Sequence, residues 1–261
     1  MKTAIKLTLI YFLMQLAAIF VVMPFAMLYV YRDSGSLDTD RIQQLSLAPA
    51  MLLGFLFMGG FLWKGGYLKQ GKQLYALTTP DFLGWSLLAG ISGIGLLFLL
   101  SPWLSFLPDW MNNTFNVLQS GWLGILCIAV LGPILEEMLF RGAITEALLR
   151  KYSPVKAIVI SGLVFGIFHV NPAQVVTACF FGFLLAWVYY KSQSLIPCIL
   201  IHILNNSLSV YLNIEYPEIE EVPDVLGTPA TLAGLVVCSL LLFFALRKLN
   251  HFKQHTTTTE L

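Results

Sequence analysis

Long apolar runs, separated by short polar segments, dominate the chain. Eight of these runs approach or exceed the roughly 20 residues that a helix needs to cross a bilayer. They lie near residues 7–31, 46–63, 83–101, 121–150, 155–170, 173–190, 194–212 and 230–247. The pattern predicts an all-α, polytopic integral membrane protein with about eight transmembrane helices.

Polar segments between and beyond the runs predict where the chain leaves the membrane. Lys2 and Lys6 precede a first run that is too long for a signal-peptide core, so we expect a retained first span. Residues 213–229 are acidic and carry three prolines, which predicts an exposed loop. The Thr-rich end of the chain is expected to be disordered.

Composition supports the membrane prediction and narrows the partners. Hydrophobic residues make up 57% of the chain and charged residues 11%, whereas soluble domains have about 45–50% and about 25%. The hydrophobic composition predicts a lipid bilayer as the surroundings. The net charge of +1 gives no strong positive potential that would attract nucleic acid, so we expect no nucleic-acid partner. The four cysteines stand singly, without a CxxC pair, which argues against a disulfide framework or a thiolate metal site.

Basic residues predict the orientation. With eight spans and the N-terminus inside, thirteen of the fifteen Lys and Arg residues fall on the inner side, and only Arg32 and Arg41 fall outside. This asymmetry fits the positive-inside rule. We therefore expect both termini in the cytoplasm and the acidic segment outside, in the plasma (inner) membrane of a bacterium.

Two adjacent carboxylates interrupt the fourth run. Residues 121–135 carry no charge, and then Glu136, Glu137 and Arg141 follow within six residues. A charge at the bilayer centre costs roughly 2.5–3.5 kcal/mol of insertion free energy on translocon scales. We therefore expect these charged residues to have a function. Glu137 and Arg141 are spaced i, i+4, while Glu136 points about 100° away. We expect Glu137 to pair with Arg141 and Glu136 to face a cavity.

Two later helices carry polar residues at matching depth. His169 ends the fifth run, and His202 and Asn206 share a face of the seventh. Counting helical rise from the turn near residue 153 puts Glu136 and His169 at similar depth. The spacing predicts that Glu136, His169, His202 and Asn206 line one cavity that opens toward the cytoplasm.

The residue types in this cavity fit peptide-bond hydrolysis. A carboxylate beside a histidine can take a proton from water. A second histidine and an amide can donate hydrogen bonds to a developing oxyanion. Glu136, His169 and His202 are also a three-ligand set for zinc with an open water position. The sequence leaves the metal-free and the zinc versions open, so zinc is a possible cofactor and no other is indicated.

The same residues resemble a known family. Three motifs stand in order on separate apolar helices: Glu136-Glu137-x-x-x-Arg141, Phe165-x-x-x-His169 and His202-x-x-x-Asn206. They are similar to the motifs of the CPBP (CAAX protease and bacteriocin-processing, or Abi) intramembrane proteases, which include the type II CAAX prenyl endopeptidases. The resemblance covers a core at residues 120–212. Residues 1–119 hold generic membrane helices, and residues 213–261 hold the acidic loop, the last span and the tail.

The resemblance implies both a fold and a division of roles. The implied fold is an eight-helix membrane protein, and the implied substrates are membrane-associated or lipidated peptides and proteins. Members of the family have been described both as metalloproteases and as metal-independent glutamate proteases. The implied roles are water activation by Glu136 and His169, oxyanion stabilisation by His202 and Asn206, and support by Glu137 and Arg141.

Two other functions remain open at this point. A non-enzymatic protein, such as a bacteriocin-immunity factor, could bind a peptide through the same cavity. An ion-coupled transporter could use the buried carboxylates, although the chain has no internal repeat of the transporter kind. Each motif alone also has a structural interpretation: an ion-pair cluster, an interfacial histidine or a hydrogen bond between helices.

Overall fold

The computed structural model describes residues 2–68, 78–104, 106–219 and 222–252, and this part of the chain is helical without strands. Its elements are α1 (Lys2–Ser34), α2 (Thr39–Lys64), α3 (Pro80–Leu100), η1 (Ser101–Trp103), α4 (Asn112–Gln119), α5 (Trp122–Leu126), η2 (Cys127–Leu131), α6 (Gly132–Glu137), η3 (Met138–Thr145), α7 (Glu146–Leu149), α8 (Pro154–Phe168), α9 (Pro172–Ser192), α10 (Ile196–Glu215) and α11 (Val222–His251). The predicted all-α polytopic membrane fold is confirmed.

Each predicted run forms a helix, but one is short for a span. In the described residues seven helical stretches are long and apolar enough to cross a membrane. The eighth, α8, has 15 residues and rises only about 22 Å, against a hydrocarbon core of roughly 30 Å. The count of eight helices therefore holds, while the expectation that all eight are full spans does not.

Helix ends differ from the hydropathy boundaries where polar side chains act as caps. α2 begins at Thr39 rather than near residue 46, because the Asp38 side chain accepts hydrogen bonds from the backbone N–H groups of Asp40 and Arg41. α11 begins in the predicted acidic loop, with a break at Gly227, whose φ of 73° suits glycine. The predicted disordered tail lies outside the described residues, apart from the end of α11.

The fourth run is one helical stretch, Trp122–Leu149, that contains two π-helical segments. In η2 the N–H of Gly132 bonds to the carbonyl of Cys127, five residues back. Pro133 follows, and because proline has no N–H the wider turn avoids its clash with the preceding turn. In η3 the hydroxyl of Thr145 donates to the carbonyl of Phe140 at 2.7 Å. Glu136 and Glu137 therefore lie between two widened turns.

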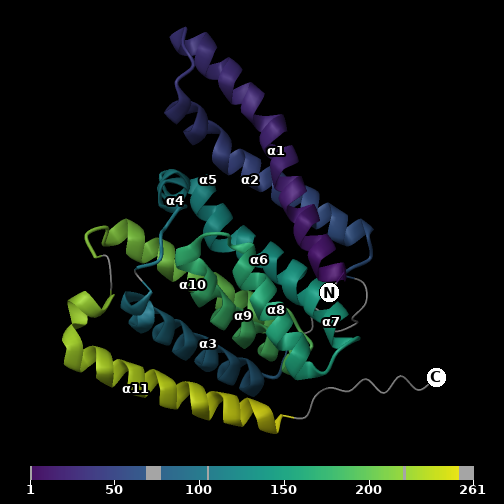
Figure 1. The fold of residues 1–261 in the computed structure, drawn as a ribbon, viewed down its shortest axis with the longest axis vertical. Helices are drawn as coiled ribbons and strands as arrows, with labels where there is room; N and C mark the ends of the chain where they lie inside the picture. The colour runs from purple at the N-terminus through teal and green to yellow at the C-terminus, as the bar shows by residue number, and fades with distance from the viewer. Residues whose placement is uncertain (1, 69–77, 105, 220–221, 253–261) are drawn as a thin grey trace.

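Consecutive long helices run up and down the molecule (Figure 1), and the two ends of the set differ in charge. The α1–α2 hairpin rises away from the other helices, and α11 packs along α3. The basic end holds the start of α1, the end of α2, the α7–α8 and α9–α10 turns and the end of α11. The acidic end holds the α1–α2 turn, the described residues of 101–104 and 106–121, the α8–α9 turn and the described residues between α10 and α11. Most described Lys and Arg residues lie at the basic end, as the sequence predicted for the cytoplasmic side.

Glycines bring α8 and α9 into close contact beside the site. A Cβ on Gly166 would lie 2.7 Å from the carbonyl oxygen of Val175 and would also clash with Sγ of Cys179. A Cβ on Gly182 would meet the backbone of Gly162 at 2.9 Å. Small residues at such positions let two membrane helices approach through their backbones. This contact fixes the end of α8, and with it His169.

Candidate active site

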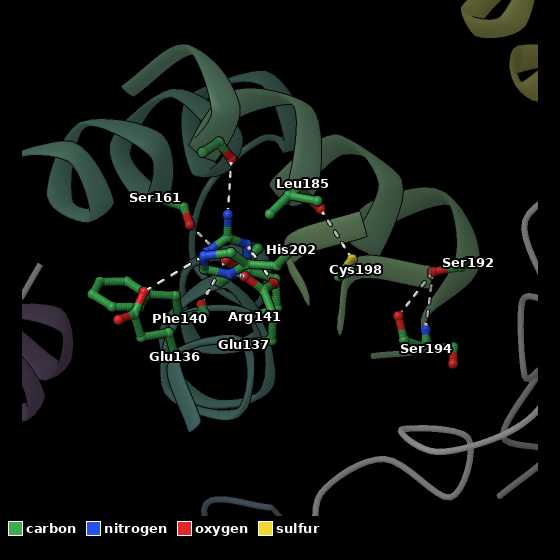
Figure 2. A network of polar contacts seen from close by, with 12 residues as sticks. Glu136, Glu137, Phe140, Arg141, Ser161, Leu185, Ser192, Ser194, Cys198 and His202 are labelled. Carbon is green, nitrogen blue, oxygen red and sulfur yellow. Dashed lines mark hydrogen bonds and ion pairs between the residues drawn. The ribbon is translucent and has the colours of Figure 1, made fainter. Parts of the chain in front are cut away.

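Glu137 is the buried centre of a polar network on three helices (Figure 2). Its Oε1 lies 2.8 Å from Nδ1 of His202, and its Oε2 lies 3.1 Å from Nε of Arg141. Glu137 and Arg141 are fully buried and His202 is 2% exposed. The predicted pair of Glu137 with Arg141 is present. Because both carboxylate oxygens are occupied, Glu137 is a structural anion and not a free base.

Arg141 is held away from solvent by contacts on its other side. Its guanidinium carbon lies 4.4 Å from the centroid of the Phe165 ring, a cation–π contact. Its Nη2 lies 3.4 Å from the carbonyl oxygen of Gly182 on α9. A buried charge is tolerated only when it is paired and hydrogen-bonded. Arg141 on η3 therefore contacts both α8 and α9. It is not among the described residues that line the cavity.

Glu136 has the opposite surroundings. It lines the cavity, and its Oε2 has no hydrogen-bond partner among the described residues. The nearest ring nitrogen, Nε2 of His202, is 3.8 Å away, beyond hydrogen-bond distance. Of the two adjacent carboxylates, Glu136 is thus the one whose oxygen is free to accept a proton.

His169 is oriented by the helix that precedes it. Its Nδ1 lies 2.9 Å from the carbonyl oxygen of Phe165. A carbonyl only accepts, so Nδ1 carries the hydrogen and the neutral ring keeps its lone pair on Nε2. The ring also packs edge-on against the rings of Phe165 and Phe168. His169 therefore offers a fixed proton acceptor to the cavity that it lines.

Asn206 is bound to the π-helical segment next to Glu136. Its Nδ2 donates to the carbonyl of Ile128 at 2.9 Å. In an α-helix that carbonyl would accept from the N–H of Gly132, but Gly132 bonds to Cys127, and the next residue, Pro133, has no N–H. The Asn206 side chain thus supplies the donor that the backbone lacks. One hydrogen of its amide remains for a ligand.

The four predicted residues Glu136, His169, His202 and Asn206 line one cavity of about 640 Å³. The lining from α1, α2 and α3 is mostly apolar and includes Phe12, Met51 and Phe98. The lining from α4, α9 and α10 mixes apolar and polar side chains. Its polar members include Gln119, Gln174, Thr177, Asn205, Ser209 and Asn213. The size and the mixed lining suit a peptide segment with apolar side chains.

The cavity extends toward the acidic end. Its described lining includes Ser101, Asp109, Met111, Asn112 and Asn213, and no residue of the α7–α8 or α9–α10 turn. The opening of the cavity toward the cytoplasm stays a prediction. The depths behind it were counted from the basic-end turns alone, without α4, which contributes to the cavity lining.

The turn between α8 and α9 is clamped to the segment that precedes α4. The buried side chain of Asn171 donates to Asp109 at 2.9 Å and accepts from the backbone N–H of Trp110 at 3.0 Å. Between His169 and Asn171, Val170 has φ of 60°, which is strained for a β-branched residue. The clamp holds this backbone in place and so fixes His169 from its C-terminal side.

The described residues do not fit the zinc alternative. No three His, Cys, Asp or Glu side chains within the described part of the chain gather in a group that could hold a metal. We derive no chemical step through a metal.

Sequence reasoning missed the parts of the site that come from outside the motifs. Tyr11 and Gln15 of α1 line the cavity, although the first helices looked generic. The Tyr11 ring packs on Phe168 at 4.7 Å between centroids. Asp109 and Asn171 were also missed. The polar Gln15 in an apolar run was the signal for α1, while nothing in the sequence links residue 109 to residue 171.

Comparison with known proteins agrees with the motifs. The family model described as "Type II CAAX prenyl endopeptidase Rce1-like" matches residues 118–208. This segment is similar to that family. The resemblance to the CPBP family of intramembrane proteases is thereby confirmed for the segment that carries all three motifs.

A curated relative supports the Rce1-like assignment. YdiL of Bacillus subtilis, which is named as a membrane peptidase, is 30% identical over 127 residues. The alignment covers 49% of this chain and 50% of the relative, so the chain spans about half the length of the curated protein it matches. No solved structure matches the chain at a significant level.

Proposed function

We propose that this chain is an intramembrane endopeptidase that hydrolyses membrane-associated or lipidated peptides and proteins. The observation that carries the proposal is the unequal environment of two adjacent carboxylates. Glu137 is ion-paired with Arg141 at 3.1 Å and lies 2.8 Å from Nδ1 of His202, while Glu136 lines the cavity and its Oε2 lies 3.8 Å from Nε2 of His202. The Rce1-like segment and the membrane-peptidase relative support a protease rather than a transporter.

The proposed reaction begins with a water molecule between Glu136 and His169. Glu136, together with Nε2 of His169, takes a proton from the water as its oxygen bonds to the carbonyl carbon of the substrate. The carbonyl π electrons move to oxygen and form a tetrahedral oxyanion. The collapse of this intermediate breaks the C–N bond, and the proton passes to the leaving amine. Water is consumed, and a carboxylate and an amine are released.

Two donors are available for the oxyanion. The free amide hydrogen of Asn206 is one. The second is Nε2 of His202 when it carries a hydrogen, because Nδ1 of this ring is hydrogen-bonded to Glu137. Removal of one such donor typically lowers kcat about 10²–10³-fold. We place the reaction on the plasma membrane of a bacterium, at the depth of Glu136.

The test compares new peptide termini in membranes from cells that carry wild-type protein, Glu136→Gln or the matched control Glu146→Gln. Glu146 lies at the basic end and pairs with Arg150. We expect termini that are present with wild type and Glu146→Gln but reduced at least about 100-fold with Glu136→Gln. Identical termini in all three membranes, at equal insertion, would refute the protease and favour a peptide-binding protein.

A further inference from the structure

We infer that Asn205 is a positioning residue for the proposed reaction. Its side chain fixes the amide of Asn206 in the orientation that leaves one N–H of Asn206 for the oxyanion. The inference rests on the proposed endopeptidase function and on the role proposed there for Asn206. It gives a task to a residue that the three motifs leave unspecified.

The carbonyl of Ile128 decides which way the Asn206 amide is turned. An asparagine amide can rotate by 180° and exchange its oxygen and nitrogen with little change in shape. A carbonyl oxygen only accepts hydrogen bonds, and Nδ2 of Asn206 lies 2.9 Å from that of Ile128. In the reverse orientation two oxygens would face each other at this distance and repel. The nitrogen of Asn206 therefore faces η2.

This orientation directs the other end of the amide toward Asn205. Nδ2 of Asn205 donates to Oδ1 of Asn206 at 3.1 Å. The Asn206 amide is thus held at both of its polar atoms, by an acceptor on η2 and by a donor on α10. Neither contact uses the second hydrogen on Nδ2 of Asn206, whose direction they fix.

The contact between Asn205 and Asn206 is unusual for neighbours in a helix. Successive side chains point about 100° apart, so they do not normally face each other. Here both side chains are partly buried and both line the cavity. A hydrogen bond is stronger away from bulk water, and a polar atom that loses its partner there is costly. The contact therefore restrains the Asn206 amide more than it would on an exposed surface.

The restraint matters because an amide has two ends of opposite polarity. A donor lowers the barrier when its N–H already points to the place where the oxyanion forms. A freely rotating amide would also present its oxygen, which repels a developing negative charge. Asn205 removes this alternative before the substrate binds. Its effect falls on the transition state, so its loss should lower kcat and leave KM nearly unchanged.

The experiment uses purified full-length protein in liposomes. The probe is a synthetic copy of a segment whose new terminus depends on Glu136 in the membrane comparison described above. Asn205→Leu keeps the branched shape of the side chain and removes the donor. We expect kcat to fall about tenfold, less than the about 10²–10³-fold loss of a whole oxyanion donor, with KM within about twofold of wild type.

The matched control makes the same change away from the cavity. Asn116 is exposed on α4 and does not line the cavity, and Asn116→Leu should leave kcat and KM unchanged. Asn205→Ala removes the same donor with less bulk. It should give the same pattern as Asn205→Leu, so the test does not depend on one variant folding.

A double-variant cycle shows whether Asn205 acts through Asn206. In an Asn206→Ala background the amide that Asn205 orients is gone, so Asn205→Leu should cause no further loss of kcat. The residual cleavage is followed over longer incubations. A direct contact of Asn205 with the substrate, or damage to the fold, would instead lower kcat by the same factor in both backgrounds.

Three results would overturn the inference while cleavage still depends on Glu136. They are an unchanged kcat in the Asn205 variants, an equal loss in both backgrounds, and a rise in KM at constant kcat. Failure of the proposed function is recognised one step earlier. If no new terminus depends on Glu136, the endopeptidase proposal falls, and the role of Asn205 falls with it.

Discussion

At the residue scale, the site depends on two adjacent carboxylates with different surroundings. Glu137 is paired with Arg141 and His202, and Glu136 faces the cavity. The i, i+4 spacing predicted the pair of Glu137 with Arg141, because both lie on one helix. The 2.8 Å contact of Glu137 with His202 spans 65 residues, and no local rule predicts it. The motif spacing thus predicted which residues gather, but not that His202 would bind Glu137 more closely than Glu136.

Asn206 provides a test at the same scale. Asn206→Ala should lower the free energy of unfolding by about 1–3 kcal/mol, because the Ile128 carbonyl loses its donor. In a Pro133→Ala background the backbone N–H restored at residue 133 can donate to the Ile128 carbonyl. Asn206→Ala should therefore lower the free energy of unfolding by less in this background than in the wild type. Thermal unfolding of the four proteins of this cycle in detergent measures the coupling.

Peptide cleavage separates the two roles of Asn206. The amide is needed for the oxyanion in either background, so activity should stay low in the double variant while stability recovers. Asn206→Ala could instead lower the free energy of unfolding equally in the wild-type and the Pro133→Ala backgrounds. That result would show that the hydrogen bond to the Ile128 carbonyl is not the source of the stabilisation.

At the element scale, the helices were predictable because their length and apolar composition follow from the bilayer. The π-helical segments η2 and η3 were not predicted, since they arise from Pro133 and from the Thr145 hydroxyl within an otherwise regular pattern. The eight-residue helix α4 lies between two predicted spans and is too short for the apolar-run pattern to predict. Of these elements, α4 and η2 contribute residues to the described cavity lining, and η3 does not.

The contact between α8 and α9 predicts a sharp difference between two glycines. Gly166→Ala should destabilise the protein by about 1–3 kcal/mol and reduce cleavage, because its Cβ meets backbone atoms of α9 and shifts His169. Gly84→Ala in α3 has nothing within 4 Å and should be neutral or stabilising by up to about 1 kcal/mol. Unfolding and cleavage assays on both variants check this.

The two glycine variants also test whether packing positions the site. If Gly166→Ala keeps full cleavage activity despite lower stability, the close approach of α8 and α9 serves the fold alone. A drop in activity for Gly84→Ala as well would point to a general loss of folded protein.

At the scale of the whole molecule, the basic and acidic ends predict the orientation of the cavity. A cysteine at exposed Asn113, at the acidic end, should react with a membrane-impermeant maleimide in intact cells. A cysteine at exposed Lys151, at the basic end, should react only after the cells are opened. The expected difference in labelling is at least about tenfold, because a reagent that cannot cross the membrane meets only the outer end.

The native cysteines set the background for this measurement. Cys127 and Cys198 are buried and Cys179 and Cys238 are partly buried, so the wild-type protein gives the signal to subtract. Labelling of Lys151→Cys alone in intact cells would reverse the orientation and place the cavity on the cytoplasmic side. The sequence predicted the charge asymmetry between the two ends, but not that α4 would contribute to the cavity lining.

The shortness of α8 has a consequence for how a hydrolase works inside a lipid bilayer. If its first residues lie at the inner surface, about 8 Å of hydrocarbon thickness remains above its C-terminal end. The turn there is occupied by Asp109 and Asn171, whose polar groups favour a local dip of the outer leaflet. On this geometry the bilayer over His169 is thinned. If the chain is the proposed hydrolase, this dip is the shortest route by which water reaches Glu136.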